Sequence, residues 1–111
     1  MTSPVYITVP NMNDSVSRIV LNGEQYGIRF TYNDTHDYWS FGLYDGLGNP
    51  LAIGIKIVPG IVLNMFFGAR EMPKGVFYTR TKLDRIGKDA FQCGDAHFAW
   101  LSLAELKESH G

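Results

Sequence analysis

The chain has 111 residues, 45% of them hydrophobic, which is enough for one small core and too little for two ordinary domains. Ten Lys and Arg against eleven Asp and Glu give a formal net charge of −1, so no excess of positive charge favours nucleic acid or an anionic membrane surface. A single cysteine, Cys93, excludes an internal disulfide, and no apolar run reaches the roughly 18 residues of a membrane-spanning helix.

The N-terminal part of the chain predicts two strands. The first 14 residues lack the basic start and the apolar run of a secretion signal, so we expect a protein that is made and kept in solution. Val5 to Val9 is predicted as the first strand and Ser15 to Leu21 as the second. Asn22-Gly23 then supplies the two positive-φ positions of a type I′ turn, so the second strand should pair antiparallel with the next segment of the chain.

The middle of the chain predicts a three-strand meander. Its first strand alternates at period two, with inward residues Tyr26, Ile28, Phe30 and Tyr32. After a bend at residues 33–37, the pattern repeats with Trp39, Phe41 and Leu43. A second turn, Asp45 to Pro50, leads into a strand that is expected to present Leu51, Ile53, Ile55 and Ile57 on one face.

The remaining segments complete an all-β pattern. Residues 61–67 are predicted as a buried strand or one helical turn, because seven continuous apolar residues fit both. Residues 68–75 read as a loop, residues 76–81 as a strand, the polar stretch up to residue 95 as a long loop, and residues 97–103 as the last strand before a short C-terminal tail. We expect one domain over residues 1–111, a small antiparallel β-barrel or β-sandwich of about seven strands.

Two clusters carry side chains that can do chemistry. Asp34, His36 and Asp37 lie within four residues, but Asn and Asp also form turns by bonding their own backbone, and the turn is the favoured interpretation. Cys93, Asp95 and His97 would share one side of an extended segment and could hold zinc with one open position. Gly94 argues for a loop there and no fourth ligand lies at a recognised spacing, so we expect no metal and no other cofactor.

Other kinds of site have weak support. No serine lies in a nucleophile elbow, and the glycines do not form a phosphate-binding loop. A base-stacking platform would need a basic groove, so core packing or an interface is the favoured use of the aromatic residues Tyr26, Tyr32, Tyr38, Trp39 and Tyr44. Two alternatives remain open: a ligand-binding barrel for sugar or single-stranded nucleic acid, and a metal-dependent enzyme using Cys93, Asp95 and His97.

A longer pattern runs from Arg18 to Leu63. It begins with a strand ending in Leu-x-Gly, followed by an aromatic strand ending in Tyr-Asn. The next strand starts at Trp and leads into Tyr-Asp, Gly and Pro-Leu. An apolar strand ending in Val-x-Gly completes the pattern. Its main positions here are Gly23, Tyr32, Trp39, Tyr44, Asp45, Gly48 and Pro50. This pattern resembles the small baseplate plug proteins of contractile-tailed bacteriophages, first described for a cyanophage baseplate, and the resemblance extends over about residues 14–103.

The resemblance implies a structural virion protein of a phage or prophage, located where the tail tube meets the central hub and spike. It implies no active site, no cofactor, and partners among the tube, hub and spike proteins and other copies of the chain, with no nucleic acid or membrane. The protein would reside in the host bacterial cytoplasm before assembly and in the tail baseplate afterwards. We assign Met65, Phe66, Phe67 and Arg70 to an intersubunit surface, with burial of residues 61–67 in the core as the alternative.

Overall fold

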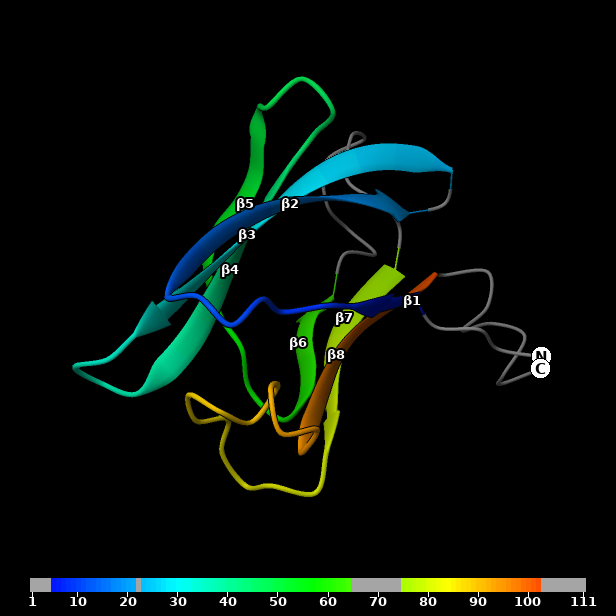
Figure 1. The fold of residues 1–111 in the computed structure, drawn as a ribbon. Helices are drawn as coiled ribbons and strands as arrows, with labels where there is room; N and C mark the ends of the chain where they lie inside the picture. The colour runs from blue at the N-terminus through cyan, green and yellow to red at the C-terminus, as the bar shows by residue number, and fades with distance from the viewer. Residues whose placement is uncertain (1–4, 22, 65–74, 103–111) are drawn as a thin grey trace, which may run out of the picture.

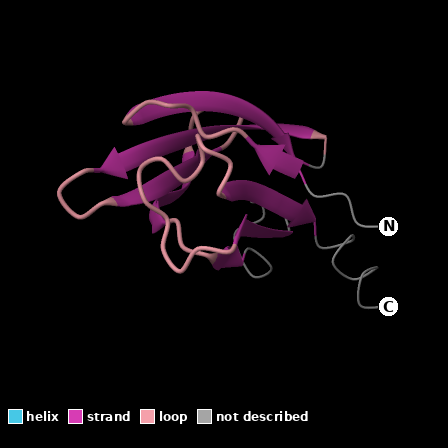
Figure 2. Ribbon diagram, turned by 60° about the horizontal axis from the view of Figure 1, so that its bottom comes forward, coloured by secondary structure: helices cyan, strands magenta, loops and turns pink. Residues whose placement is uncertain are grey.

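The computed structural model describes residues 5–21, 23–64 and 75–102, which form eight strands in two antiparallel sheets. The first sheet, called here the meander sheet, has the order β2-β3-β4-β5 and consists of β2 (Asp14–Leu21), β3 (Glu24–Asn33), β4 (Tyr38–Tyr44) and β5 (Pro50–Lys56). The second sheet has the order β1-β8-β7-β6 and consists of β1 (Val5–Ile7), β8 (Ala96–Ser102), β7 (Gly75–Thr81) and β6 (Gly60–Asn64). Figure 1 shows the two sheets as separate layers, and Figure 2 shows strands and loops for the described residues. The all-β prediction is confirmed, and of its two architectures the fold is the sandwich.

The hairpins of the meander sheet follow the pattern of turn residues in the sequence. Leu21 pairs with Glu24, so a two-residue connection joins β2 to β3, and Gly23 in it has a φ of +82°. A positive φ of this size costs a residue with a side chain more than it costs glycine. β3 then pairs with β4 from Gly27–Tyr44 to Asn33–Tyr38 without a register shift. The predicted meander is therefore confirmed, and β2 pairs with β3 as the Asn22-Gly23 turn predicts.

The predicted faces of β5 are wrong at two residues: Ile53 does not face the core, and Ala52, which strict alternation places on the opposite face, packs against it. Phe41 pairs with Ile55 and Leu43 with Ala52, so β5 carries one more residue than β4 over this step. Gly54 takes up the extra residue with a φ of +71°, which marks a β-bulge. The bulge breaks the alternation that the sequence suggests, and Ile53 is turned outward with 62% of its surface exposed.

The core lies between the two sheets and is rich in aromatic rings. Phe77 and Phe98 of the second sheet stack with ring centroids 5.6 Å apart, and Phe41 of the meander sheet lies 5.1 Å from Phe77 and 5.2 Å from Phe98. Phe30 meets Phe98 edge to face at 5.5 Å. Such ring pairs add to the hydrophobic gain of burial, so this cluster is the main contact that joins the sheets.

The second sheet contains the segment for which the sequence left two possibilities. β6 extends to Asn64, so the strand interpretation is right for its described part, and Val62 packs against the core. The last strand is described over Ala96–Ser102 and starts one residue earlier than predicted. On β7, a Cβ atom at Gly75 would lie 2.8 Å from the indole of Trp100, so close packing requires glycine there. Among the residues that the structure describes, no helix has the length and hydrophobicity to cross a membrane.

Candidate assembly surfaces

The bend between β3 and β4 is tied to a distant part of the chain. The Tyr32 hydroxyl donates a hydrogen bond to the Asp37 carboxylate, and Arg85 Nη2 lies 2.8 Å from Asp37 Oδ2. The same Arg85 nitrogen donates to the Asp37 carbonyl at 2.7 Å. Arg85 belongs to the loop of residues 82–95, which joins β7 to β8. We call this bend, together with the loop, the clamped end of the sandwich.

Trp39 anchors the same loop from the start of β4. Its side chain is 2% exposed, and its indole Nε1 donates to the carbonyls of Gly87 at 3.2 Å and Lys88 at 3.3 Å. Phe91 meets the indole edge to face at 6.1 Å. Ile86 and Ala90 from this loop are buried in the core. The loop therefore closes the hydrophobic core at this end instead of lying free in solvent.

The electrostatics of the clamped end result from these bonds. The hydrogen bond from Tyr32 is the largest cause that holds the pKa of Asp37 below its usual value, with the Arg85 charge as a further cause. The same hydrogen bond, with some desolvation, raises the pKa of Tyr32 to about 12. The pair is therefore most stable with a neutral phenol and a charged carboxylate.

The bend itself is built as its sequence predicts. Asn33 Oδ1 accepts hydrogen bonds from the backbone N–H groups of Thr35 at 3.0 Å and His36 at 3.1 Å, which is an Asx turn. Asp37 has a φ of +53°, the one positive value at a described residue other than glycine. Asp34 and His36 are exposed, and the structure gives them no side-chain bond to Asp37. The turn interpretation of this cluster is thus the right one.

At the opposite end of the meander sheet, the β4–β5 turn is held by one of its own residues. Asp45 Oδ1 accepts hydrogen bonds from the backbone N–H groups of Leu47 at 2.9 Å and Asn49 at 2.8 Å, and Asp45 Oδ2 accepts from Asn49 Nδ2 at 3.0 Å. Gly48 supplies a φ of +90°, and Pro50 opposite Tyr44 begins β5. The bonds from Asn49 are the largest causes that lower the pKa of Asp45. We call residues 45–49 the turn end.

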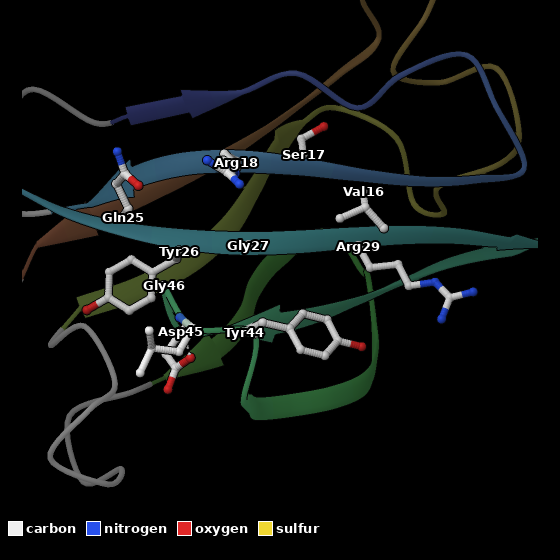
Figure 3. Close-up of a pocket in the computed structure, with 12 residues that line it drawn as sticks. Val16, Ser17, Arg18, Gln25, Tyr26, Gly27, Arg29, Tyr44, Asp45 and Gly46 are labelled. Carbon is white, nitrogen blue, oxygen red and sulfur yellow. Dashed lines mark hydrogen bonds between the residues drawn. The ribbon is translucent and has the colours of Figure 1, made fainter.

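The turn end presents an apolar side chain beside a groove. Leu47 is 90% exposed, the highest value among the large hydrophobic residues that the structure describes. The turn borders a hollow of about 460 Å³ on the outer face of the meander sheet, where Gly27 leaves room and the half-buried ring of Tyr44 forms part of the wall (Figure 3). A rigid turn with an exposed leucine beside a partly apolar groove is suited to contact with another protein.

The aromatic residues named as a possible stacking platform do not form one surface. Tyr26 and Trp39 are buried in the core, and Tyr32 packs against the Trp39 ring at 5.2 Å between centroids. Tyr38 lies at the clamped end beneath the Lys56 ammonium, whereas Tyr44 lies at the turn end. The side chains that could face a ligand are therefore separated by the length of β4.

Cys93, Asp95 and His97 do not adopt the extended arrangement that a metal site would need. Gly94 has a φ of +80°, which breaks the alternation, and the Cys93 thiol donates to the Asp89 carbonyl at 2.7 Å. His97 packs edge to face against Tyr6 at 6.2 Å on the outer face of the second sheet. Desolvation and the Asp95 carboxylate raise the pKa of the Cys93 thiol, which disfavours the thiolate. Within residues 5–21, 23–64 and 75–102, no three His, Cys, Asp or Glu side chains gather where they could bind a metal.

The structure does not test the intersubunit surface that the sequence predicts. Met65, Phe66, Phe67 and Arg70 lie outside the described residues, so that assignment stays a prediction. Arg85 and the buried side of the 82–95 loop were missed from the sequence, because the loop is polar and its few apolar residues lack periodicity. Leu47 was missed as well, although a leucine between two glycines of a tight turn is a signal that could have identified it.

Comparison with known proteins gives one informative match. The family model described as cyanophage baseplate Pam3 plug gp18 matches residues 5–103, a range that includes both sheets, the clamped end and the turn end. A search of curated proteins finds no match for the chain.

Proposed function

Because the chain belongs to the family of cyanophage baseplate plug proteins, we propose that it is a structural part of a contractile phage tail and catalyses no reaction. The observation that carries the proposal is the extent of the match, residues 5–103, which takes in every described strand. In the finer proposal, the protein joins the tail tube to the central hub and spike and is present in several copies. It resides in the cytoplasm of the host bacterium until assembly and in the virion baseplate afterwards.

The roles of the pattern residues support this proposal. Trp39 holds the 82–95 loop, Tyr32 holds the Asp37 carboxylate that binds Arg85 of this loop, and Asp45 and Gly48 shape the β4–β5 turn. All four residues stabilise the fold. The side chains of Tyr32, Trp39 and Asp45 form hydrogen bonds within the chain, and Gly48 adopts the positive φ that the turn needs. A tail component needs this property, because it must keep one shape while neighbouring subunits bind to its surface.

The turn end is the surface that we propose for contact with neighbouring tail proteins. Leu47 is held out by a turn that Asp45 fixes through three accepted hydrogen bonds, so little conformational entropy is lost when a partner covers it. The adjoining groove offers the half-buried ring of Tyr44, and tyrosine is enriched at protein interfaces. Met65, Phe66, Phe67 and Arg70 are proposed as a second contact region on the basis of their sequence alone.

Deleting the coding sequence from the phage or prophage genome that carries it tests the proposal. We expect induced cells to yield no particles with complete tails in negative-stain electron micrographs, and plasmid-borne wild-type chain to restore them. Particles with normal tails and normal infectivity after deletion would contradict the proposal.

A second complementation separates a structural role from the metal-enzyme alternative. The double variant Cys93→Ser, His97→Gln removes two of the three ligands that such an enzyme would use, while serine keeps a hydroxyl that can donate to the Asp89 carbonyl. We expect this variant to restore tails as well as the wild type does. Failure of a folded Cys93→Ser, His97→Gln protein to restore tails would favour the metal-dependent alternative.

A further inference from the structure

The free edge of β2 exposes unpaired backbone groups. The Tyr32 N–H donates to the carbonyl of Asn13, the residue before β2, at 2.8 Å. This bond fixes the β2 residues whose backbone N–H and C=O groups point toward β3: Ser15, Ser17, Ile19 and Leu21. The N–H and C=O groups of Asp14, Val16, Arg18 and Val20 therefore point away from β3. β2 pairs with no other described strand, and no hydrogen bond to these groups is found in the part of the chain that the structure describes.

The other edge of the same sheet is protected against strand pairing. β5 contains the bulge at Gly54, begins with Pro50 and ends with exposed Lys56, three features that block the addition of a strand. β2 is eight residues long, has no register shift and contains no proline or glycine. Among the described strands, β2 is therefore the one long, regular edge that lacks such protection.

The exposed side chains along this edge are complementary to themselves. Their order is Met12, Asp14, Val16, Arg18 and Val20, with Met12, Val16 and Val20 exposed by 59%, 72% and 55%. If two copies of the edge run antiparallel about Val16, Val16 meets Val16, Asp14 meets Arg18, and Val20 approaches Met12. A register centred on Arg18 would instead oppose two like charges, which destabilises a strand pair.

We propose that two copies of the chain pair through β2, antiparallel and centred on Val16. The pairing joins the two meander sheets into one, with two backbone hydrogen bonds in each of the pairs Asp14–Arg18, Val16–Val16 and Arg18–Asp14. Within the described residues Arg18 has no ion-pair partner, so it is available to the second copy. Asp14 already binds Arg29 at 2.6 Å, and a carboxylate has lone pairs left for a further donor.

The proposed dimer has a small interface. The proposal concerns the free protein and does not depend on where the chain lies in a virion. One strand pair buries less surface than the roughly 1,200 Å² at the lower limit of stable interfaces, so the dimer should be weak. We expect a reversible equilibrium between monomer and dimer with a Kd on the order of 10–500 µM. Failure of this inference would leave the baseplate proposal untouched, because the deletion experiment does not depend on self-association.

Charge variants test the register directly. Arg18→Asp gives an edge with two acids, and Asp14→Arg gives an edge with two bases, so each variant should self-associate at least about tenfold more weakly than wild type. In an equal mixture of the two, every acid meets a base, and dimers should return to within about threefold of the wild-type affinity. Sedimentation velocity at several concentrations measures all three samples. A wild type that stays monomeric to ~1 mM, or a mixture no more associated than its components, overturns the proposal.

A cross-link test does not depend on the charge variants folding well. In a Cys93→Ser background, Val16→Cys places the two thiols opposite each other, within the Cα separation of about 4.4–6.8 Å that a disulfide requires. We expect mild oxidation to give a covalent dimer, detected on a non-reducing gel. The matched control is Ile53→Cys in the same background, an exposed residue on the protected edge of the same sheet, which should stay monomeric. Equal cross-linking at the two positions contradicts specific β2 pairing.

Discussion

The two ends of the meander sheet are held in different ways. At the clamped end, Asp37 and Trp39 bind a loop that lies 48 residues or more further along the chain, and Tyr32 holds Asp37 in place. At the turn end, Asp45 binds only residues two to four positions away. The clamped end is therefore part of the cooperative core, whereas the turn end is a local structure attached to it.

This difference indicates that the residues of the family pattern have two roles, global stability at the clamped end and the shape of a contact surface at the turn end. A change at the clamped end should affect the stability of the whole protein, because it opens the core where Ile86 and Ala90 are buried. A change at the turn end should leave the core intact and alter only the surface that the turn presents to a partner. Substitutions at the two ends test this division, from the largest expected effect on stability to the smallest.

Trp39→Ala should cause the largest loss. It removes a fully buried ring, its contact with Phe91 and both hydrogen bonds to the loop, so we expect the free energy of unfolding to fall by about 3–5 kcal/mol. Urea titration followed by circular dichroism measures it. Trp39→Phe, which keeps a ring but loses the indole N–H, should cost clearly less. A loss below about 1 kcal/mol for Trp39→Ala would mean that the loop is not part of the core.

Tyr32 should make stability at the clamped end sensitive to alkali. Its pKa in the folded protein is raised to about 12, whereas the unfolded value is about 10, so its contribution is complete below pH 10 and is lost as the pH rises through 12. In Tyr32→Phe this part of the loss of stability at high pH should be absent. Urea titrations of both proteins between pH 9 and pH 12 provide the comparison. Parallel curves over that range would contradict the Tyr32–Asp37 bond.

Asp45→Ala should loosen the turn end and little else. The N–H groups of Leu47 and Asn49 lose the carboxylate oxygen that accepts their hydrogen bonds. We expect these amides to exchange with solvent at least about tenfold faster, while amides of β3 and β8 keep their protection. Hydrogen exchange followed by NMR resolves the residues individually. Faster exchange throughout the core would show that the two ends are not independent.

Leu47→Asp should leave stability within about 0.5 kcal/mol of wild type, because the side chain is almost fully exposed. We nevertheless expect it to fail in restoring tails to the deletion strain, since it places a charge where a partner is proposed to bind. Ile53→Asp, at an exposed residue of β5 outside the turn end, is the matched control and should restore tails. Normal tails with Leu47→Asp would remove the turn end from the assembly surface.

The sequence was informative where local rules decide the structure. The alternation in β3 and β4, the pair Asn22-Gly23 and the residues around Asp45 predict the meander correctly, because turn chemistry and period two act over a few residues. The prediction was wrong at Ile53, since a bulge depends on how β5 fits its neighbour and leaves little trace in hydrophobic alternation.

Long-range contacts could not be predicted in the same way. Nothing local to Arg85 indicates that it meets the β3–β4 bend, and nothing local to Phe91 indicates that it meets Trp39. The pairing of β1 with β8 joins residues about ninety positions apart. The assembly surface is harder still, because an exposed leucine or an open edge is meaningful only once the fold shows which surfaces stay uncovered. The assignment of Met65, Phe66, Phe67 and Arg70 remains a prediction for that reason.

Locating the chain in purified tails tests the central claim most directly. We predict that a cryo-electron microscopy reconstruction of the baseplate, together with quantitative mass spectrometry of the same particles, will show this β-sandwich in a fixed number of copies per tail, with residues 45–49 against a neighbouring protein. Purified, infectious particles that contain no copy of the chain would contradict the account.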